Sequence, residues 1–203
     1  MNGTDIKGQA DYLDKQNNNK LLLLKYEIYM LLNNSHISLR AVEPEDLDML
    51  YGWENSTGLW YHGNTLAPYS KLVIRQYIND SLEMDIYQSK QLRLMVDLHN
   101  DITIGTLDLY EIDAHNRRAG IGILIDETFR QKGYASQALE LMRDYAFNFL
   151  YLHQLYAYIS ISNEKSVALF QKAGYKEVGI LKDWLQRGDT FEDVRLFQLH
   201  NDK

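Results

Sequence analysis

The stretch from Arg130 to Ser136 has the residue types and spacing of an anion-binding loop. It consists of Arg130, Gln131, Lys132, Gly133, Tyr134, Ala135 and Ser136. An apolar run precedes it and a helical pattern follows, so its amides lie at a helix N-terminus, where N–H groups lack partners and the helix dipole is positive. Gly133 lets the backbone approach an anion without a Cβ in the way. We predict a pyrophosphate site in which main-chain amides do most of the binding, with Arg130 and Lys132 assisting.

The elements that must position this loop alternate between strands and helices. Period-two apolar patterns and turn residues predict strands over 37–42, 92–98, 102–109, 118–125, 155–161, 175–179 and 191–199. Helical spacing predicts helices that end near 53, begin near 70, and cover 133–149 and 163–172. The crossover through 133–149 makes strand 155–161 parallel to strand 118–125, so a ligand is expected at the carboxyl ends of these strands.

Composition narrows the class of protein. The 203 residues with 45% hydrophobic content favour one domain. Lys+Arg 21 against Asp+Glu 28 gives a net charge of -7, which argues against nucleic-acid and anionic-membrane partners. With no cysteine and no metal-ligand spacing among six histidines, we expect no metal site, and a cytoplasmic protein.

The first 35 residues differ from the rest. Residues 1–20 are polar and rich in Asn and Gln, and 21–32 are apolar but too short to span a bilayer, which takes about 20 apolar residues. We expect residues 1–35 to be a mobile extension with a short apolar helix, and residues 36–203 to be the functional domain. A start at Met30 is the alternative.

Several motifs resemble the GCN5-related N-acetyltransferase (GNAT) family, most closely its spermidine and ribosomal-protein alanine branches. The spacing Arg130-x-x-Gly133-x-Ala135 resembles the family's coenzyme A loop. The run from Asn163 to Gly174-Tyr175 is similar to its second coenzyme A element. The segments 111–119 and 188–193 resemble those two branches, and the element order over about 36–200 is that of the family.

This resemblance implies an α/β (α+β) fold, with a mixed, mostly antiparallel sheet of six to seven strands flanked by about four helices. It implies an N-acetyltransferase that moves an acetyl group from acetyl-coenzyme A to a primary amine by direct attack. Beside the loop Arg130–Ser136, the residues expected to contact the cosubstrate are Ile123, Leu124, Ile125, Asn163 and Phe170. Asn163 is also a plain helix N-cap.

Acetyl transfer needs a neutral amine, a stabilised oxyanion and a protonated thiolate. Glu111, expected at a strand exit, is the candidate base or amine anchor, although an exposed glutamate without a role has the same sequence signature. Where many family members have the tyrosine that protonates the thiolate, this chain has Phe170, so Ser166, Tyr134 or solvent must replace it. Gly120 and Gly122 permit a bulge at 121–123, which would leave backbone amides unpaired and able to bind the oxyanion. The alternative is that they are small residues beneath a packed helix.

The acceptor stays open at this stage between a small molecule, a polyamine and a protein N-terminus. The loop 60–69 has no carboxylate, and Gly120 stands where the spermidine branch has a glutamate, so two anchors for a polycation are missing. Because Phe170 lacks a proton to donate, a non-catalytic coenzyme A binding module is the alternative function. A homo-oligomer is compatible with the sequence.

Overall fold

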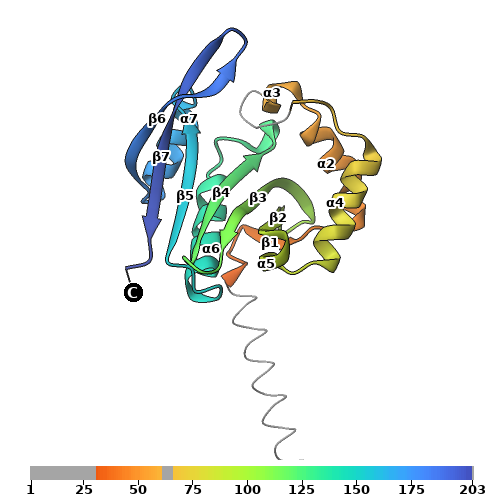
Figure 1. Cartoon of the computed structure of the whole chain (residues 1–203). Helices are drawn as coiled ribbons and strands as arrows, with labels where there is room; N and C mark the ends of the chain where they lie inside the picture. The colour runs from red at the N-terminus through yellow and green to blue at the C-terminus, as the bar shows by residue number, and fades with distance from the viewer. Residues whose placement is uncertain (1–30, 61–65, 203) are drawn as a thin grey trace, which may run out of the picture.

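The computed structural model describes residues 31–60 and 66–202, which form one seven-stranded sheet with helices on both faces (Figure 1). The strand order is β1-β2-β3-β4-β5-β7-β6. The strands are β1 (Ile37–Ala41), β2 (Gln91–Leu98), β3 (Ile102–Asp113), β4 (Arg118–Ile125), β5 (Gln154–Ser160), β6 (Lys176–Arg187) and β7 (Thr190–His200). All neighbouring strands are antiparallel except β4 and β5, which are parallel.

Among the described residues, four α-helices have eight or more residues. They are α2 (Leu47–Glu54), α4 (Lys71–Glu83), α6 (Tyr134–Asn148) and α7 (Glu164–Lys172). Shorter pieces are α3 (Thr57–Trp60), α5 (Ile86–Ser89) and two 3-10 turns, η1 (Pro44–Asp46) and η2 (Glu127–Phe129). The fold class predicted from the sequence is confirmed.

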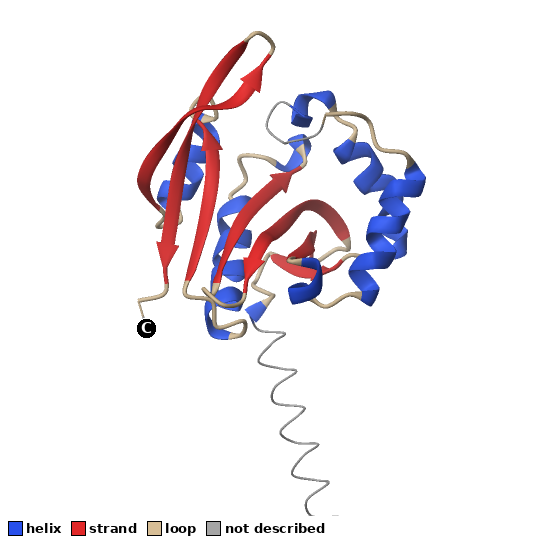
Figure 2. Cartoon of the chain, viewed as in Figure 1, coloured by secondary structure: helices blue, strands red, loops and turns tan. Residues whose placement is uncertain are grey.

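The two faces of the sheet are covered unequally. Helices α6 and α7 pack on one face, where alternate residues of β5 (Leu155, Ala157 and Ile159) join the main core. On the other face, α2 and α4 form a smaller core with Met95 of β2. Figure 2 shows α6 and α7 behind β4 and β5, with no described helix in front of these two strands. We call this uncovered surface of β4, β5 and β7 the bare face.

The predicted elements are close to the observed ones. The turn at 99–101 joins β2 to β3, Ser70 caps α4 by accepting from the Val73 amide, and Asn163 caps α7. Strands β3 and β6 run further than predicted. Residues 1–30 lie outside the described part of the chain, so the predicted mobile extension stays a prediction. Within residues 31–35, Leu32 accepts a hydrogen bond from the Leu39 amide and Asn33 bridges Ser38, so this short segment joins the domain.

Candidate acetyl-transfer site

Strands β4 and β5 separate after a short stretch of pairing. Their parallel register covers Arg118, Ala119 and Gly120 against Gln154, Leu155 and Tyr156. Beyond this point β4 continues to Ile125 and β5 to Ser160 without a mutual register, and the two strands diverge (Figure 1). The sheet therefore contains a V-shaped opening whose vertex is the Gly120–Tyr156 pair. On the side of β5, the main chain of 121–125 therefore faces an opening, while its other side stays paired with β3.

The prediction of a bulge at 121–123 is wrong. From Gly120 to Ile125, β4 pairs with β3 residue by residue without a shift. The alternative, that Gly120 and Gly122 lie beneath a packed helix, is also wrong, because their neighbours Ala119 and Ile121 take the helix-facing positions. Both glycines face the bare face, where a Cβ on Gly120 would overlap the Tyr110 ring. The glycine leaves room for that ring.

The irregularity lies in β3 instead. Tyr110 pairs with Gly120 and Asp113 with Arg118, so two residues of β3, Glu111 and Ile112, oppose one residue of β4. Leu107 and Leu109 belong to the core, and plain alternation would send residue 111 there as well. The bulge, with Glu111 at φ 49°, gives the core position to Ile112 and turns Glu111 to the opposite face. Glu111 is thus inside β3, not at a strand exit as predicted.

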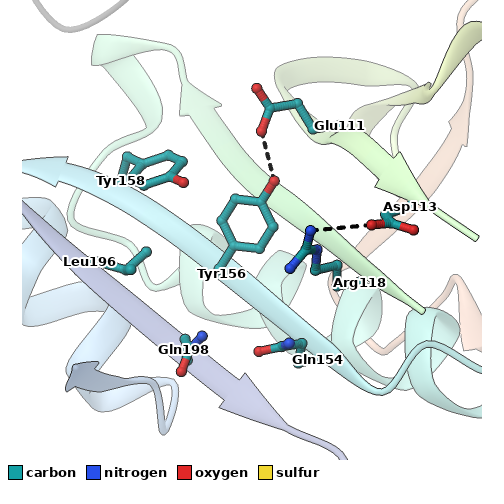
Figure 3. Close-up of a pocket in the computed structure, with 8 residues that line it drawn as sticks. All are labelled: Glu111, Asp113, Arg118, Gln154, Tyr156, Tyr158, Leu196 and Gln198. Carbon is teal, nitrogen blue, oxygen red and sulfur yellow. Dashed lines mark hydrogen bonds and ion pairs between the residues drawn. The ribbon is translucent and has the colours of Figure 1, made fainter. Parts of the chain in front are cut away.

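Glu111 lies in a pocket of about 310 Å³ on the bare face, at the vertex of the V (Figure 3). The lining residues are Glu111, Asp113, Arg118, Gln154, Tyr156, Tyr158, Leu196 and Gln198. The Tyr156 hydroxyl donates to the Glu111 carboxylate at 2.7 Å, and Arg118 pairs with Asp113 at 3.2 Å. Burial, followed by the hydrogen bond to Glu111, raises the pKa of Tyr156 above its usual range. Tyr156 therefore stays protonated and holds the Glu111 carboxylate in place.

The loop Arg130–Ser136 has the geometry of an anion cradle. Gln131 (φ 63°) and Gly133 (φ 83°) both adopt left-handed conformations, and Gly133 is the N-cap of α6. The first intrahelical bond runs from the Gln137 amide to the Gly133 carbonyl, so the preceding amides 134–136 have no partner inside the helix. Apart from its chain neighbours, no atom of residues 31–60 or 66–202 lies within 4 Å of where a Gly133 Cβ would be. The loop therefore fits a phosphate group.

The basic side chains of this loop bind the protein itself. Arg130 donates from Nε to the Ile125 carbonyl at 2.8 Å and pairs with Glu127 at 3.4 Å. Lys132 donates to the Thr128 carbonyl at 3.0 Å and lies over the Phe129 ring. These contacts tie the loop to the end of β4. They support the expectation that main-chain amides, not the two cations, carry most of the anion binding.

The third candidate element is the start of α7, directly after β5. Asn163 accepts a hydrogen bond from the Ser166 amide at 3.2 Å, which confirms the predicted cap. Ser166 is half-buried in the first turn of α7. Phe170 is 3% exposed and contacts the Tyr175 ring edge-on at 5.0 Å, in the core beneath the helix end that Gly174 closes. This packing gives Phe170 a structural role, and its contact with the cosubstrate stays a prediction.

A fourth cluster, not predicted from the sequence, ties the end of β5 to the β6–β7 hairpin. Glu192 accepts hydrogen bonds from the Ser160 hydroxyl, the Ser162 amide and the Arg187 guanidinium. Burial acts against the charged form, but these bonds prevail and lower the pKa of Glu192 to about 2. Asp193, next along β7, binds Lys182 and the amide of Asp183, whose φ is 49° at the irregularity of β6.

The structure arranges the predicted site residues on two sides of the opening. Ile123–Ile125, the loop 130–136 and the start of α7 gather toward the open end of the V, on and near the helix-covered face. Glu111 lies at the vertex on the bare face, and among the described residues no hydrogen bond or ion pair joins it to Ser166. The pocket partners Tyr156 and Tyr158 were missed, although their alternation with Leu155, Ala157 and Ile159 in the sequence already assigns both tyrosines to the non-core face.

Two negative findings hold for the described residues. No group of three or more His, Cys, Asp or Glu side chains within 31–60 and 66–202 is placed to hold a metal ion. In the same part of the chain, no helix is long and apolar enough to cross a membrane.

A parallel strand pair that opens into a V, followed by a glycine-containing anion loop, is the arrangement expected of a coenzyme A dependent acyltransferase. A family model described as "Acetyltransferase (GNAT) domain" matches residues 36–176. The chain therefore belongs to the GNAT acetyltransferase family, and it is an N-acetyltransferase whose cosubstrate is acetyl-coenzyme A.

Relatives extend over most of the domain. The chain is 27% identical to the spermidine N(1)-acetyltransferase of Vibrio cholerae, over 80% of this chain and 91% of that protein. It is 30% identical to N-acetyltransferase p20 of Bacillus licheniformis, over 83% and 94% of the two chains. A crystal structure of the Vibrio cholerae enzyme in complex with CoA and spermine has a TM-score of 0.75 and 27% identity, covering 82% of this chain and 96% of that one.

Proposed function

We propose that the acceptor is a primary amine that enters from the bare face and reaches the V at Glu111. The observation that carries this proposal is the Glu111–Tyr156 hydrogen bond inside the vertex pocket. A carboxylate held by a neighbouring hydroxyl keeps one oxygen free for an ammonium group. Because an alkylammonium has a pKa of about 10, it must lose a proton before it can attack, and Glu111 is the group positioned to take that proton or to order a water that does.

We assign the binding of acetyl-coenzyme A to the helix-covered side of the opening. Acetyl-coenzyme A supplies the acetyl group as a thioester. The amides of 131–136 bind its pyrophosphate, with Arg130 and Lys132 nearby. Main-chain groups of Ile123–Ile125 lie along the opening, and Asn163 and Phe170 are the further residues assigned to contact the cosubstrate. Ser166 is the proposed proton donor to the departing thiolate, because its hydroxyl is in the α7 turn that follows β5. The amine and the thiolate thus use opposite faces of the sheet.

The experiment that tests this function is a thiol-release assay with acetyl-coenzyme A and a panel of amines. The panel contains polyamines, amino acids, aminoglycosides and peptides with free N-termini. We expect thiol release with at least one of these classes and a higher melting temperature in acetyl-coenzyme A, but not in ATP or NAD. Equal stabilisation by ATP would refute the assignment of the loop. Stabilisation by acetyl-coenzyme A with no turnover on any amine would refute the acceptor site and favour the non-catalytic module.

A homo-oligomer is part of the same proposal. A structure of the Vibrio cholerae enzyme described as dodecameric has a TM-score of 0.70 and 26% identity to this chain. Light scattering coupled to size-exclusion chromatography measures the mass directly, and a monomer at micromolar concentration would contradict the expectation. The cytoplasm remains the expected location.

A further inference from the structure

Four aromatic rings form a continuous row across the bare face. Tyr110 contacts Tyr156 edge-on with ring centres 6.1 Å apart, and Tyr156 contacts Tyr158 in the same way at 5.4 Å. Tyr158 is stacked on Trp184 of β6 at 6.4 Å with 25° between the planes. We call Tyr110, Tyr156, Tyr158 and Trp184 the aromatic row. It leads from Glu111 at the vertex toward the β6–β7 hairpin.

The far half of the aromatic row is open to solvent. Tyr158 is 43% exposed and Trp184 56% exposed, whereas Tyr110 and Tyr156 are half-buried. The core on the other face of β5 is formed by the alternating aliphatic residues, so the packing of the fold does not account for these two rings. Large aromatic side chains exposed beside a pocket are typical of a surface that binds a ligand.

The charges of the pocket decide which ligand suits this surface. Two carboxylates line it, and Asp113 is already paired with Arg118 at 3.2 Å. Glu111 is therefore the lining carboxylate that can neutralise an ammonium. A second ammonium lying along the row would be attracted weakly by the aromatic faces, but it would find no unpaired carboxylate among the residues that line the pocket. A flat or apolar body, in contrast, would cover the exposed rings.

We propose that Tyr158 and Trp184 bind the non-reacting part of the acceptor, and that this acceptor is an arylalkylamine, a primary amine on a short chain that ends in an aromatic ring. The inference rests on the proposed function, since it assumes that the amine lies at Glu111. The amine binds the Glu111 carboxylate, the chain passes Tyr156, and the ring stacks at Tyr158 and Trp184. These two residues then determine specificity without taking part in the proton transfers.

Steady-state kinetics at saturating acetyl-coenzyme A test the proposal with three amines. Phenethylamine carries the ring, n-butylamine has one amine without a ring, and spermidine has several amines. We expect the highest kcat/KM with phenethylamine, because loss of one aromatic contact is worth about 2- to 12-fold. Trp184→Ala should raise the KM for phenethylamine by about this factor, while kcat, the KM for n-butylamine and the KM for acetyl-coenzyme A stay unchanged. Tyr158→Ala, in the pocket lining, should raise the KM for phenethylamine more than the KM for n-butylamine.

Phe191→Ala is the matched control. Phe191 is 59% exposed on the same hairpin, and it makes no ring contact with another aromatic side chain of the described residues. It should leave every constant unchanged. A preference for spermidine, or an unchanged KM for phenethylamine in both row variants, would overturn the proposal.

Calorimetric titration of phenethylamine into the complex with free coenzyme A separates this inference from the proposed function. If no amine is turned over but phenethylamine binds the native protein and binds Trp184→Ala several-fold more weakly, the catalytic assignment fails and the aromatic subsite stands. If binding is equal in both proteins, or is undetectable in the native protein, the aromatic subsite is refuted.

Discussion

The two sides of the opening between β4 and β5 are built from different atoms. On the proposed cosubstrate side, the candidate binding groups are the amides at the start of α6 and the open edge of β4, and the side chains of Arg130 and Lys132 donate hydrogen bonds to the carbonyls of Ile125 and Thr128. On the proposed acceptor side, the candidate binding groups are side chains, with Glu111, Tyr156 and Tyr158 lining the pocket. Main-chain binding tolerates many sequences, whereas the side-chain pocket changes with each substitution. This difference lets one scaffold keep its acyl donor while its acceptor varies.

The largest effect should come from the side-chain pocket. Glu111→Gln removes the charge that anchors the amine and the group that accepts its proton, so kcat/KM should fall by about 10²- to 10⁴-fold. The rise in melting temperature with acetyl-coenzyme A should stay as in the native protein, because the loop 130–136 is separate from Glu111. Tyr156→Phe keeps the carboxylate and should cost less activity. Loss of the acetyl-coenzyme A response in Glu111→Gln would mean that the two sides are not independent.

A second prediction tests whether the main chain of the loop 130–136 binds acetyl-coenzyme A. Gly133→Val places a β-branched side chain at φ 83° and in the open space above the amides. We expect the thermal response to acetyl-coenzyme A to disappear and the domain to stay folded, at a cost of about 1 kcal/mol for the left-handed conformation. Arg130→Ala is the control and should retain most of the affinity. If the alanine variant loses affinity as completely as the valine variant, the main chain is not the principal ligand.

A smaller effect concerns the proton donor to the thiolate. Ser166→Ala should lower kcat by about an order of magnitude without changing acetyl-coenzyme A affinity, because positioned acid catalysis acts on the transition state. Tyr134→Phe tests the alternative donor at the start of α6. Phe170→Tyr should raise kcat if its para position reaches the sulfur. An unchanged kcat in all three variants would assign the proton to solvent, provided that product release is not rate-limiting.

Glu192, which ties the end of β5 to the β6–β7 hairpin, should have a moderate effect on stability that depends on pH. The Glu192 pKa of about 2 in the folded protein lies below the ordinary glutamate value of 4.5, so the charged form stabilises the fold above pH 4.5. This contribution falls as the pH drops from 4.5 and is lost once Glu192 is protonated near pH 2. Denaturant unfolding should therefore show Glu192→Gln to be less stable than the native protein at pH 7, with a smaller difference at pH 3. A difference that is the same at both pH values would contradict the assigned pKa.

The smallest effect is expected from deletion of residues 1–29. Residues 1–20 have no apolar period, and the described contacts of the N-terminal segment begin at Leu32. Melting temperature and turnover should be unchanged. Loss of folded protein on deletion would show that the apolar stretch 21–32 contributes to the core or to an oligomer contact.

The sequence by itself determined the local elements of the cosubstrate side. A helix start, its glycine and the N-cap Asn163 are defined within a few residues, because capping and left-handed conformations depend on short-range hydrogen bonds and sterics. The alternation of β5 likewise determines which face Tyr156 and Tyr158 occupy. The gap between Leu109 and Ile112 in the apolar pattern of β3 was a signal of the bulge that the prediction did not use.

Only the tertiary structure decided the geometry of the proposed acceptor side. Whether an extra residue falls in β3 or in β4 depends on the register between the two strands, and this register is set by core packing over the whole sheet. The bulge turns Glu111 away from the core, and the parallel pairing of β4 with β5 brings Tyr156, 45 residues later in the chain, within 2.7 Å of it. A carboxylate with no local sequence signal of function becomes the candidate amine anchor because long-range pairing assembles its partners.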